Sequence, residues 1–168
     1  MADPPSAGRL EGLTAFVTGS TTGIGESMAR RFASEGARVL VHGLDETAAQ
    51  TVAADIRAKN GEAAAIVGDL ADLLGPERLA SKAVQLLGYV DMLVNNAALK
   101  TRSNLESTDA ATFDRVIAVN IRAPLLLTRS LPPHFRARDT TTVLNIGSVN
   151  GYCGERTCSL TPSARAAS

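Results

Sequence analysis

A glycine-rich loop is the part of this chain best suited to do chemistry. Residues 18–25 read Thr-Gly-Ser-Thr-Thr-Gly-Ile-Gly and directly follow the apolar run 13–17. A loop of this kind, between a buried strand and a helix, can hold a pyrophosphate with backbone N–H groups and the positive end of the helix dipole. Gly19 would permit the tight turn, Gly23 the close approach of the ligand, and Gly25 the close packing of helix on strand. The loop predicts dinucleotide binding, and a purely structural turn is the alternative.

Four further clusters of glycine or polar residues follow apolar runs along the chain. They are residues 43–45, 69–70, 95–98 and 147–148. The carboxyl ends of parallel strands meet at one edge of a sheet, and open α/β sheets bind their ligands at that edge. Each cluster alone could be an ordinary turn. Together with the glycine loop they predict one ligand crevice.

The elements that must position these clusters alternate along the chain. Predicted strands cover residues 13–17, 37–42, 63–67, 91–95 and 142–146. Helices are predicted between them, with apolar residues three or four apart on one face. The residues expected on these faces are Ile24, Met28 and Phe32; Ala49, Val52, Ala53 and Ile56; Leu79, Ala83, Leu86 and Leu87; and Phe113, Val116, Ile117, Asn120, Ile121 and Leu125. The alternation predicts an α/β fold with a doubly wound parallel sheet.

Composition excludes several other classes of protein. The 168 residues are 45% hydrophobic, which suits one domain with a real core. The formal net charge is zero, so a nucleic-acid partner is not expected. Residues 1–12 lack the apolar core of a signal peptide, and no apolar stretch is long enough to span a bilayer. Cys153 and Cys158 form no metal-ligand set. We expect a cytoplasmic protein without a metal or a membrane partner.

The order and spacing of these motifs resemble the classical short-chain dehydrogenase/reductase family over residues 13–154. The resemblance implies a Rossmann-type fold, NAD or NADP as cofactor, reversible hydride transfer between an alcohol and a carbonyl, and a small-molecule substrate. It also implies a homo-oligomer. The cofactor-binding residues that it implies are Thr18, Gly19, Thr22, Gly23, Ile24, Gly25, Asp45, Asp69, Leu70, Asn96 and Ala97.

Among these, the resemblance gives Asp69 the role of accepting a hydrogen bond from the adenine amino group, with Leu70 beside the ring. Capping of the next helix is the alternative for Asp69. Asn96 and Ala97 would line the adenosine ribose, and Asn95 would help to fix the central sheet. Ala98 stands where the family more often has glycine, which slightly crowds this loop.

The resemblance also implies two residues of the catalytic machinery. Asn120 would anchor a water molecule of the proton relay, although a buried amide can equally make a structural hydrogen bond. Ser148 would hold and polarise the substrate carbonyl, and a simple serine at a strand end is its alternative.

Cofactor choice depends on the end of the second strand, His42-Gly43-Leu44-Asp45. An acidic residue there binds the ribose 2′-hydroxyl of NAD, whereas an arginine accepts the 2′-phosphate of NADP. Leu44 stands where NADP-using relatives tend to have arginine, and Thr22 where they often have a base. Asp45 comes late for the NAD role and could cap the next helix. These residues favour NAD.

The family's reaction needs a tyrosine about a dozen residues after Ser148 and a lysine four residues beyond it. The tyrosine is the general acid or base, and the lysine cation lowers its pKa. Residue 160 is Leu, 161 is Thr and 165 is Arg, so the pair is missing. Tyr152 and Arg156 have the spacing but lie too close to Ser148, and arginine cannot relay a proton. We expect an NAD(P)-dependent oxidoreductase of this family that, as written, is inactive. The alternative is a non-catalytic dinucleotide-binding remnant or a pseudogene product.

A frameshift after about Glu155 is our hypothesis for this tail. The tail can be back-translated into DNA, with the free third positions of its codons chosen, and then read in a frame shifted by two bases. In that frame it can encode Tyr-x-x-x-Lys, with the Tyr codon spanning Leu160 and Thr161. We therefore expect a disordered segment over 1–12, an NAD(P)-binding domain over 13–154 and an aberrant, disordered tail over 155–168. The chain would be truncated, leaving the sheet incomplete on its C-terminal side and the subunit interface incomplete. Sequencing the gene tests this: an open frame without a displaced Tyr-Lys codon pair would contradict it.

Overall fold

A computed structural model describes residues 8–101, 106–131 and 141–148. The strands are β1 (Thr14–Val17), β2 (Arg38–Gly43), β3 (Glu62–Val67), β4 (Met92–Asn95) and β5 (Thr142–Asn145). The helices are α1 (Gly23–Ser34), α2 (Glu46–Ala58), α3 (Gly75–Leu87) and a composite helix made of α4 (Ala110–Ile117), the π-helical segment η1 (Ala118–Arg122) and α5 (Ala123–Ser130). The expectations for residues 1–7 and for the tail, including Tyr152, Arg156 and both cysteines, lie outside the described residues.

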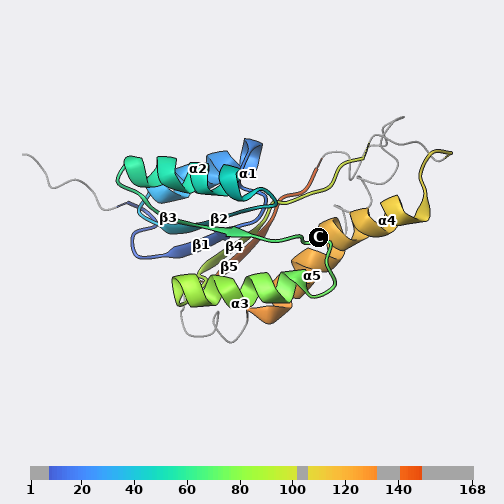
Figure 1. Ribbon diagram of the computed structural model, residues 1–168. Helices are drawn as coiled ribbons and strands as arrows, with labels where there is room; N and C mark the ends of the chain where they lie inside the picture. The colour runs from blue at the N-terminus through green and yellow to red at the C-terminus, as the bar shows by residue number, and fades with distance from the viewer. Residues whose placement is uncertain (1–7, 102–105, 132–140, 149–168) are drawn as a thin grey trace, which may run out of the picture.

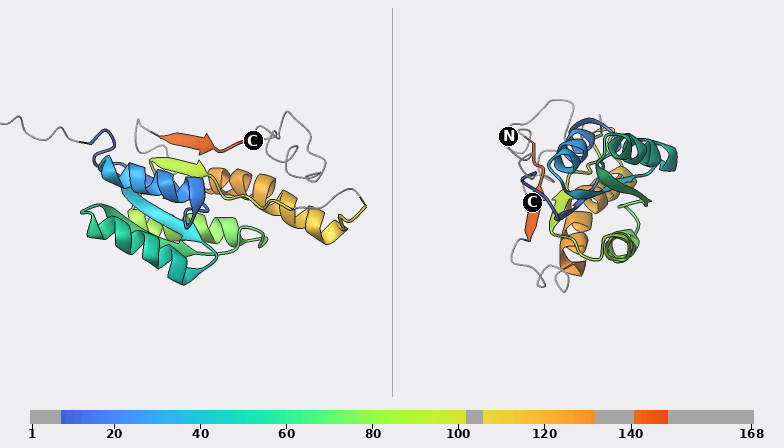
Figure 2. Two further views of the ribbon diagram at one scale, coloured as in Figure 1. Left: turned by 90° about the horizontal axis from the view of Figure 1, so that it is seen from above. Right: turned by 90° about the vertical axis from the view of Figure 1, so that its left-hand side faces the viewer.

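The strands form one parallel sheet in the order β3-β2-β1-β4-β5. Strand order reverses beside β1, where Val17 pairs with Val41 of β2 on one side and with Val94 of β4 on the other. Helices α1 and α2 cover one face, and α3 and α5 cover the other (Figure 1). The predicted doubly wound, Rossmann-type α/β fold is thus confirmed. Its last strand, β5, lies at an edge of the sheet, beside β4 (Figure 2).

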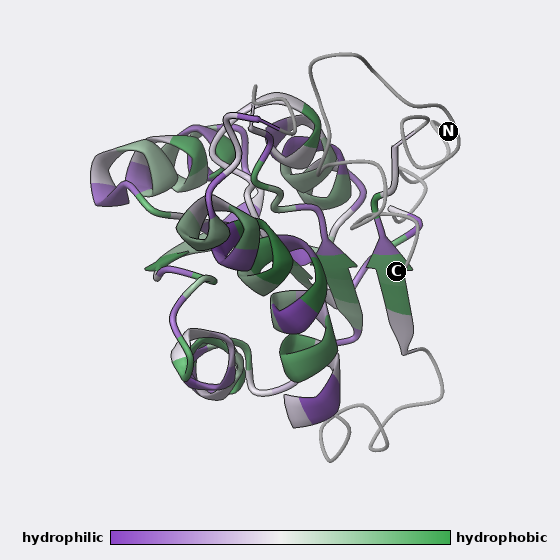
Figure 3. Ribbon diagram, turned by 90° about the vertical axis from the view of Figure 1, so that its right-hand side faces the viewer, coloured by the Kyte–Doolittle hydropathy of each residue, from purple (hydrophilic) through white to green (hydrophobic). Residues whose placement is uncertain are grey.

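Side chains alternate across the sheet and so build two apolar cores. Phe16 and Leu40 point to the face covered by α3 and α5, whereas Val17, Val39 and Val41 point to the face covered by α1 and α2. Both faces of the central strands are buried, so most of their residues are apolar and the strands are largely green in Figure 3, while polar residues such as Thr14, His42 and Asn95 stand near their ends. This rigid sheet fixes where each strand ends and therefore where the polar clusters gather.

The predicted inner face of α1 is partly wrong. Ile24 is 64% exposed, whereas Gly25, Ala29 and Ala33 are the buried residues of this helix. Small side chains let the helix axis lie close to the sheet, and Met28 and Phe32 then pack only from the flank. Helix α2 buries its four predicted residues. In α3, Leu86 is 42% exposed, while its neighbour Leu87 is buried.

The predicted face of the long helix from residue 109 is also partly wrong. Val116 and Asn120 are buried as expected, but Phe113 is 45% and Leu125 is 64% exposed. Because the π-helical segment η1 holds more residues per turn than an α-helix, the buried face shifts along the sequence. A single α-helical period therefore could not describe this element.

None of the helices in the described ranges is long and apolar enough to cross a membrane.

Candidate functional site

A cavity of about 550 Å³ lies at the carboxyl edge of the sheet. Its walls come from the glycine loop after β1, the turns after β2, β3 and β4, and one side of α4 and η1. Of the predicted cofactor residues, all but Thr18 and Gly25 line it: Gly19, Thr22, Gly23, Ile24, Asp45, Asp69, Leu70, Asn96 and Ala97. Residues as far apart in the sequence as Gly19 and Val119 thus meet at one place. The size suits a small-molecule ligand.

The glycine loop has the backbone that the sequence predicts. Gly19 and Gly23 both have φ of +60°, a conformation that residues with a Cβ rarely adopt. A Cβ on Gly25 would come within 2.4 Å of both Gly19 O and Asn96 Nδ2. The N-cap residue Thr22 makes no side-chain hydrogen bond to the first turn of α1, and Gly23 and Ile24 of this turn line the cavity. The N–H groups at a helix N-terminus favour an anionic ligand.

Thr18 lies beneath the cavity and supports its wall. Its buried Oγ1 donates to Val94 O at 3.1 Å and accepts from the backbone N–H groups of Asn96 and Ala97, each at 3.0 Å. The Asn96 amide in turn donates to Thr18 O at 3.0 Å and to Gly19 O at 2.9 Å. These bonds fasten the turn after β4 to the glycine loop. The structure therefore places Thr18 in support of the cavity, outside its lining.

Asp69 forms an ion pair across the cavity mouth. Its Oδ1 accepts from Ala71 N–H at 2.8 Å, and its Oδ2 accepts from Arg115 Nη2 of α4 at 2.8 Å. Helix α3 begins only at Gly75 with Leu74 as its N-cap, so the capping alternative for Asp69 is wrong. Partial burial raises the pKa of Asp69, but the hydrogen bonds from Ala71 and Arg115 outweigh it and hold the pKa below its usual value.

Replacing Arg115 by glutamine (R115Q) should raise the pKa of Asp69 toward the ordinary value of about 3.9. The reason is that the guanidinium stabilises the ionised carboxylate. An NMR titration of the Asp69 carboxyl carbon measures the change. R129Q is the matched control, because Arg129 pairs with Glu77 and not with Asp69. An unchanged Asp69 titration in R115Q would contradict the pairing.

The turn after β2 bears on cofactor choice. Asp45 Oδ1 accepts from Ala48 N–H at 2.8 Å and caps α2, which confirms the capping alternative for this residue. A Cβ on Gly43 would come within 2.5 Å of Thr21 Cγ2, so Thr21 occupies the space that a longer side chain at 43 would need. Leu44 is 69% exposed at the cavity rim.

His42 also lines the cavity, and sequence reasoning missed it. The ring is buried, with Nδ1 at 3.2 Å from Gly19 N and Nε2 at 3.1 Å from Gly68 O. Burial lowers the pKa of His42 to about 4, while the Gly68 carbonyl and the Asp69 carboxylate act in the opposite direction. A polar residue inside the apolar run 39–42 was the available indication in the sequence.

The two residues predicted for catalysis lie apart from this lining. Asn120 is buried, its Oδ1 accepts from Leu99 N–H at 2.8 Å, and its Nδ2 donates to Leu99 O at 2.9 Å. The side chain thus makes the structural hydrogen bonds that were the alternative. Ser148 is half-buried after β5, and neither it nor Asn120 is among the described residues that line the cavity. Asn95 donates to Asn145 Oδ1 at 2.8 Å, so it does link β4 to β5 as expected.

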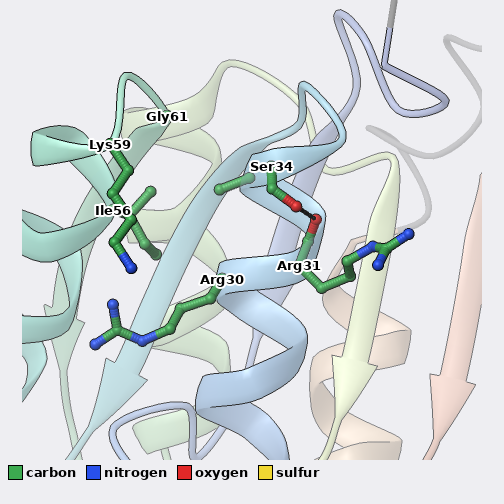
Figure 4. A pocket seen from close by; sticks show the side chains of 7 residues that line it. Arg30, Arg31, Ser34, Ile56, Lys59 and Gly61 are labelled. Atoms are coloured by element: carbon green, nitrogen blue, oxygen red, sulfur yellow. Dashed lines mark hydrogen bonds between the residues drawn. The ribbon is translucent and has the colours of Figure 1, made fainter.

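A second, smaller cavity of about 270 Å³ lies between the C-terminal ends of α1 and α2 (Figure 4). Its basic residues are Arg30, Arg31 and Lys59. Arg30 pairs with Glu26 and Asp55, and Arg31 pairs with Glu35. Cations near a helix C-terminus stabilise the helix through its dipole, so these basic residues need no ligand to explain them. We interpret this cavity as a surface groove remote from the carboxyl edge of the sheet.

Comparisons with known proteins agree with this geometry. The family model described as short chain dehydrogenase matches residues 13–167. The chain is 32% identical over 145 residues to an uncharacterized oxidoreductase of Thermotoga maritima, covering 86% of this chain and 57% of the relative. It is 32% identical over 145 residues to 2,5-dichloro-2,5-cyclohexadiene-1,4-diol dehydrogenase LinX of Sphingobium indicum, covering 86% of this chain and 58% of the relative. The chain spans about half the length of the curated relatives it matches.

Solved structures share the fold closely. A blue fluorescent protein from a metagenomic library, in complex with NADPH, superposes with a TM-score of 0.87 at 30% identity, covering 94% of this chain and 65% of that one. A 3-oxoacyl (acyl-carrier-protein) reductase from Agrobacterium tumefaciens with NADP bound gives a TM-score of 0.88 at 31% identity, covering 94% and 61%. The chain thus covers the larger part of these molecules, and its sheet is incomplete relative to theirs.

Proposed function

Because the chain belongs to the short-chain dehydrogenase family, we propose that its cavity binds NAD(P) and that it is an oxidoreductase unit for hydride transfer between an alcohol and a carbonyl. The observation that carries the proposal is the gathering of the predicted cofactor residues around one cavity at the glycine loop. We assign the dinucleotide-binding domain to residues 13–154. The described residues 8–12 were expected to be disordered, but they pack beside the end of α1, where Leu10 N–H donates to Glu35 O at 2.8 Å and Leu10 lies against the core. In a complete enzyme of this kind the bound nicotinamide would accept or deliver the hydride.

The cavity offers a distinct group for each part of a dinucleotide. The N-terminus of α1 and the loop glycines suit a pyrophosphate, since their N–H groups and lack of side chains admit a close anion. Asp69, held by Arg115, is available to accept from an adenine amino group beside Leu70. Asn96 and Ala97 form the wall that we assign to the adenosine ribose.

For the chemical step we propose that Ser148 holds the carbonyl oxygen and that Asn120 anchors a water. Both side-chain ends of Asn120 are engaged with Leu99, so the water would be held by its backbone carbonyl.

A non-catalytic dinucleotide-binding module is the second candidate function. The sequence has no lysine after Lys100 and no tyrosine at the required distance from Ser148. We therefore propose that these 168 residues bind a nicotinamide cofactor without turnover.

Calorimetric titration with NADH and NADPH, together with a turnover assay over a panel of alcohols and ketones, tests both candidates. Binding without turnover is the expected result. Measurable oxidation of any alcohol would refute the account of the missing tyrosine and lysine. Failure to bind either cofactor would refute the cofactor site itself.

We propose NAD as the preferred cofactor. The turn after β2 carries the exposed Leu44 and the carboxylate of Asp45, and neither can pair with a 2′-phosphate. Arg30 is the nearest cation along α1, but Glu26 and Asp55 already engage it. The solved structures that hold NADPH or NADP are those of other proteins, and cofactor titration of this chain decides its own preference.

Introducing a cation at this turn (L44R) should tighten NADPH binding by about tenfold and leave NADH nearly unchanged. The gain corresponds to one charge-assisted hydrogen bond, about 1.4 kcal/mol. Kd values for both cofactors measure it. L44M is the matched control, because it keeps the apolar character and adds no charge. Tighter binding of NADPH than of NADH by the unaltered protein would contradict the proposed preference.

A further inference from the structure

The imidazole of His42 links two segments of the cavity that are distant in the sequence. Gly19 N–H donates to Nδ1, and Nε2 lies 3.1 Å from Gly68 O. Since a carbonyl oxygen only accepts hydrogen bonds, Nε2 must carry the proton and Nδ1 must be the acceptor. One neutral tautomer therefore satisfies both contacts, and neither the other neutral form nor the cation does.

The surroundings hold the ring in this position. Strand β2 lies between β1 and β3, so His42 at its end reaches the glycine loop on one side and the turn after β3 on the other. Ser20 fixes the His42 backbone: Ser20 N–H donates to His42 O at 2.8 Å, and His42 N–H donates to Ser20 Oγ at 2.9 Å. Phe16 packs edge-on against the ring, with centroids 6.1 Å apart. The side chain is 2% exposed.

We propose that His42 is a positioning residue for the cofactor site: its neutral Nε2–H tautomer fixes Gly19 and so holds the glycine loop ready for a pyrophosphate. Gly19 has a φ of +60° and lies at the first bend of the loop, where an unpaired N–H would let the peptide turn away. With this N–H directed at His42, the loop keeps its shape before a ligand arrives, which lowers the entropy that binding must overcome. The identity of the ligand rests on the proposed function.

Protonation of the ring would remove this support. With a proton on Nδ1, two hydrogen-bond donors would face each other, and the hydrogen bond from Gly19 N–H to Nδ1 would be lost. The charged groups nearby are the Asp69 carboxylate after β3, the Arg115 guanidinium of α4 that pairs with it, and the Asp45 carboxylate before α2. Burial keeps the ring neutral down to acidic pH against the attraction of Asp69. Cofactor affinity should therefore fall as the pH drops below about 5, toward the His42 pKa of about 4.

Two variants distinguish the effect of the hydrogen-bond acceptor at residue 42 from the effect of side-chain volume. H42N retains an oxygen that can accept from Gly19 N–H but cannot reach Gly68 O, whereas H42L fills the space and accepts nothing. We expect H42L to speed hydrogen exchange of the Gly19 amide and to raise the Kd for NADH, each by about tenfold, the effect of one hydrogen bond. For H42N, the Gly19 exchange rate and the Kd for NADH should both stay within about threefold of the values for the unaltered chain. The NADH affinity of H42N should not fall below pH 5, because asparagine does not titrate there.

Nitrogen NMR of the His42 ring in the unaltered chain gives an independent readout. An unprotonated Nδ1 and a protonated Nε2 at neutral pH are expected. A proton on Nδ1, or an H42L variant with unchanged Gly19 exchange, would overturn the proposal even if H42L lost stability for other reasons. If the unaltered chain fails to bind NADH, the proposed function fails, but the tautomer and the Gly19 exchange rates still decide the role of His42.

Discussion

Replacing Gly19 by alanine (G19A) should lower the free energy of unfolding by about 3 kcal/mol, three times the effect of the same change at Gly23. Both residues have a φ of +60°, so both variants carry the strain of a left-handed alanine, about 1 kcal/mol. Only at Gly19 would the new Cβ lie 2.8 Å from the backbone Cα of Ala97, whereas at Gly23 it meets nothing within 4 Å. Because Ala97 is held by Thr18, it cannot move aside without loss of hydrogen bonds.

Urea denaturation followed by circular dichroism measures these differences. Gly12 is the matched control outside the cavity, since its φ is +73° and a Cβ there also meets nothing. G23A should match G12A in stability but bind NADH at least tenfold more weakly, because its Cβ enters the space of the ligand. Equal stability of G19A and G12A would show that Ala97 does not confine the loop.

Replacing Thr18 by valine (T18V) is expected to lower the free energy of unfolding by about 2 kcal/mol. Valine has nearly the same shape but no hydroxyl, so the N–H group of Ala97 loses the hydroxyl that accepts from it. Asn96 N–H and Val94 O also lose the hydroxyl but keep a hydrogen bond, since Asn96 N–H donates to Val94 O at 3.1 Å and Thr18 N–H donates to the same oxygen at 3.0 Å. Each buried group left without a hydrogen bond costs about 1–3 kcal/mol. The turn after β4 should also loosen and weaken NADH binding.

The serine variant (T18S) separates the hydroxyl from the methyl group. It retains all three hydrogen bonds and should lose only about 1 kcal/mol from the removed methyl group. Denaturation midpoints and NADH titrations of the two variants give the comparison. If T18S were as unstable as T18V, packing of the methyl group and not the hydroxyl would fasten the two loops.

The sequence predicted the strands, their parallel arrangement and the glycine loop because these depend on local patterns. Runs of apolar residues specify buried strands, and Gly19 and Gly23 stand where the backbone needs a positive φ. It predicted the inner helix faces less well. Ile24 was expected inside α1 on hydrophobicity alone, but the small residues Gly25 and Ala29 decide which side can approach the sheet.

Contacts between distant segments could not be predicted from the sequence. His42 bonds with Gly19 across 23 residues, Arg115 with Asp69 across 46, and Thr18 with Ala97 across 79. Arg115 is one of several surface arginines in the sequence, and only the fold shows that it faces Asp69. The roles assigned to Ser148 and Asn120 remain predictions.

The sequence by itself determined the family, the fold and the edge of the sheet where a dinucleotide would lie, since the spacing of strands and glycines encodes all three. Only the tertiary structure decided how that edge is held. In the fold, Thr18 supports the cavity wall through its bond with Asn96 N–H. Asp45 caps α2, and His42 accepts a hydrogen bond from Gly19 N–H of the glycine loop. The physical reason is that a hydrogen bond depends on atoms within about 3 Å, and the pairing of strands, not their order in the chain, brings those atoms together.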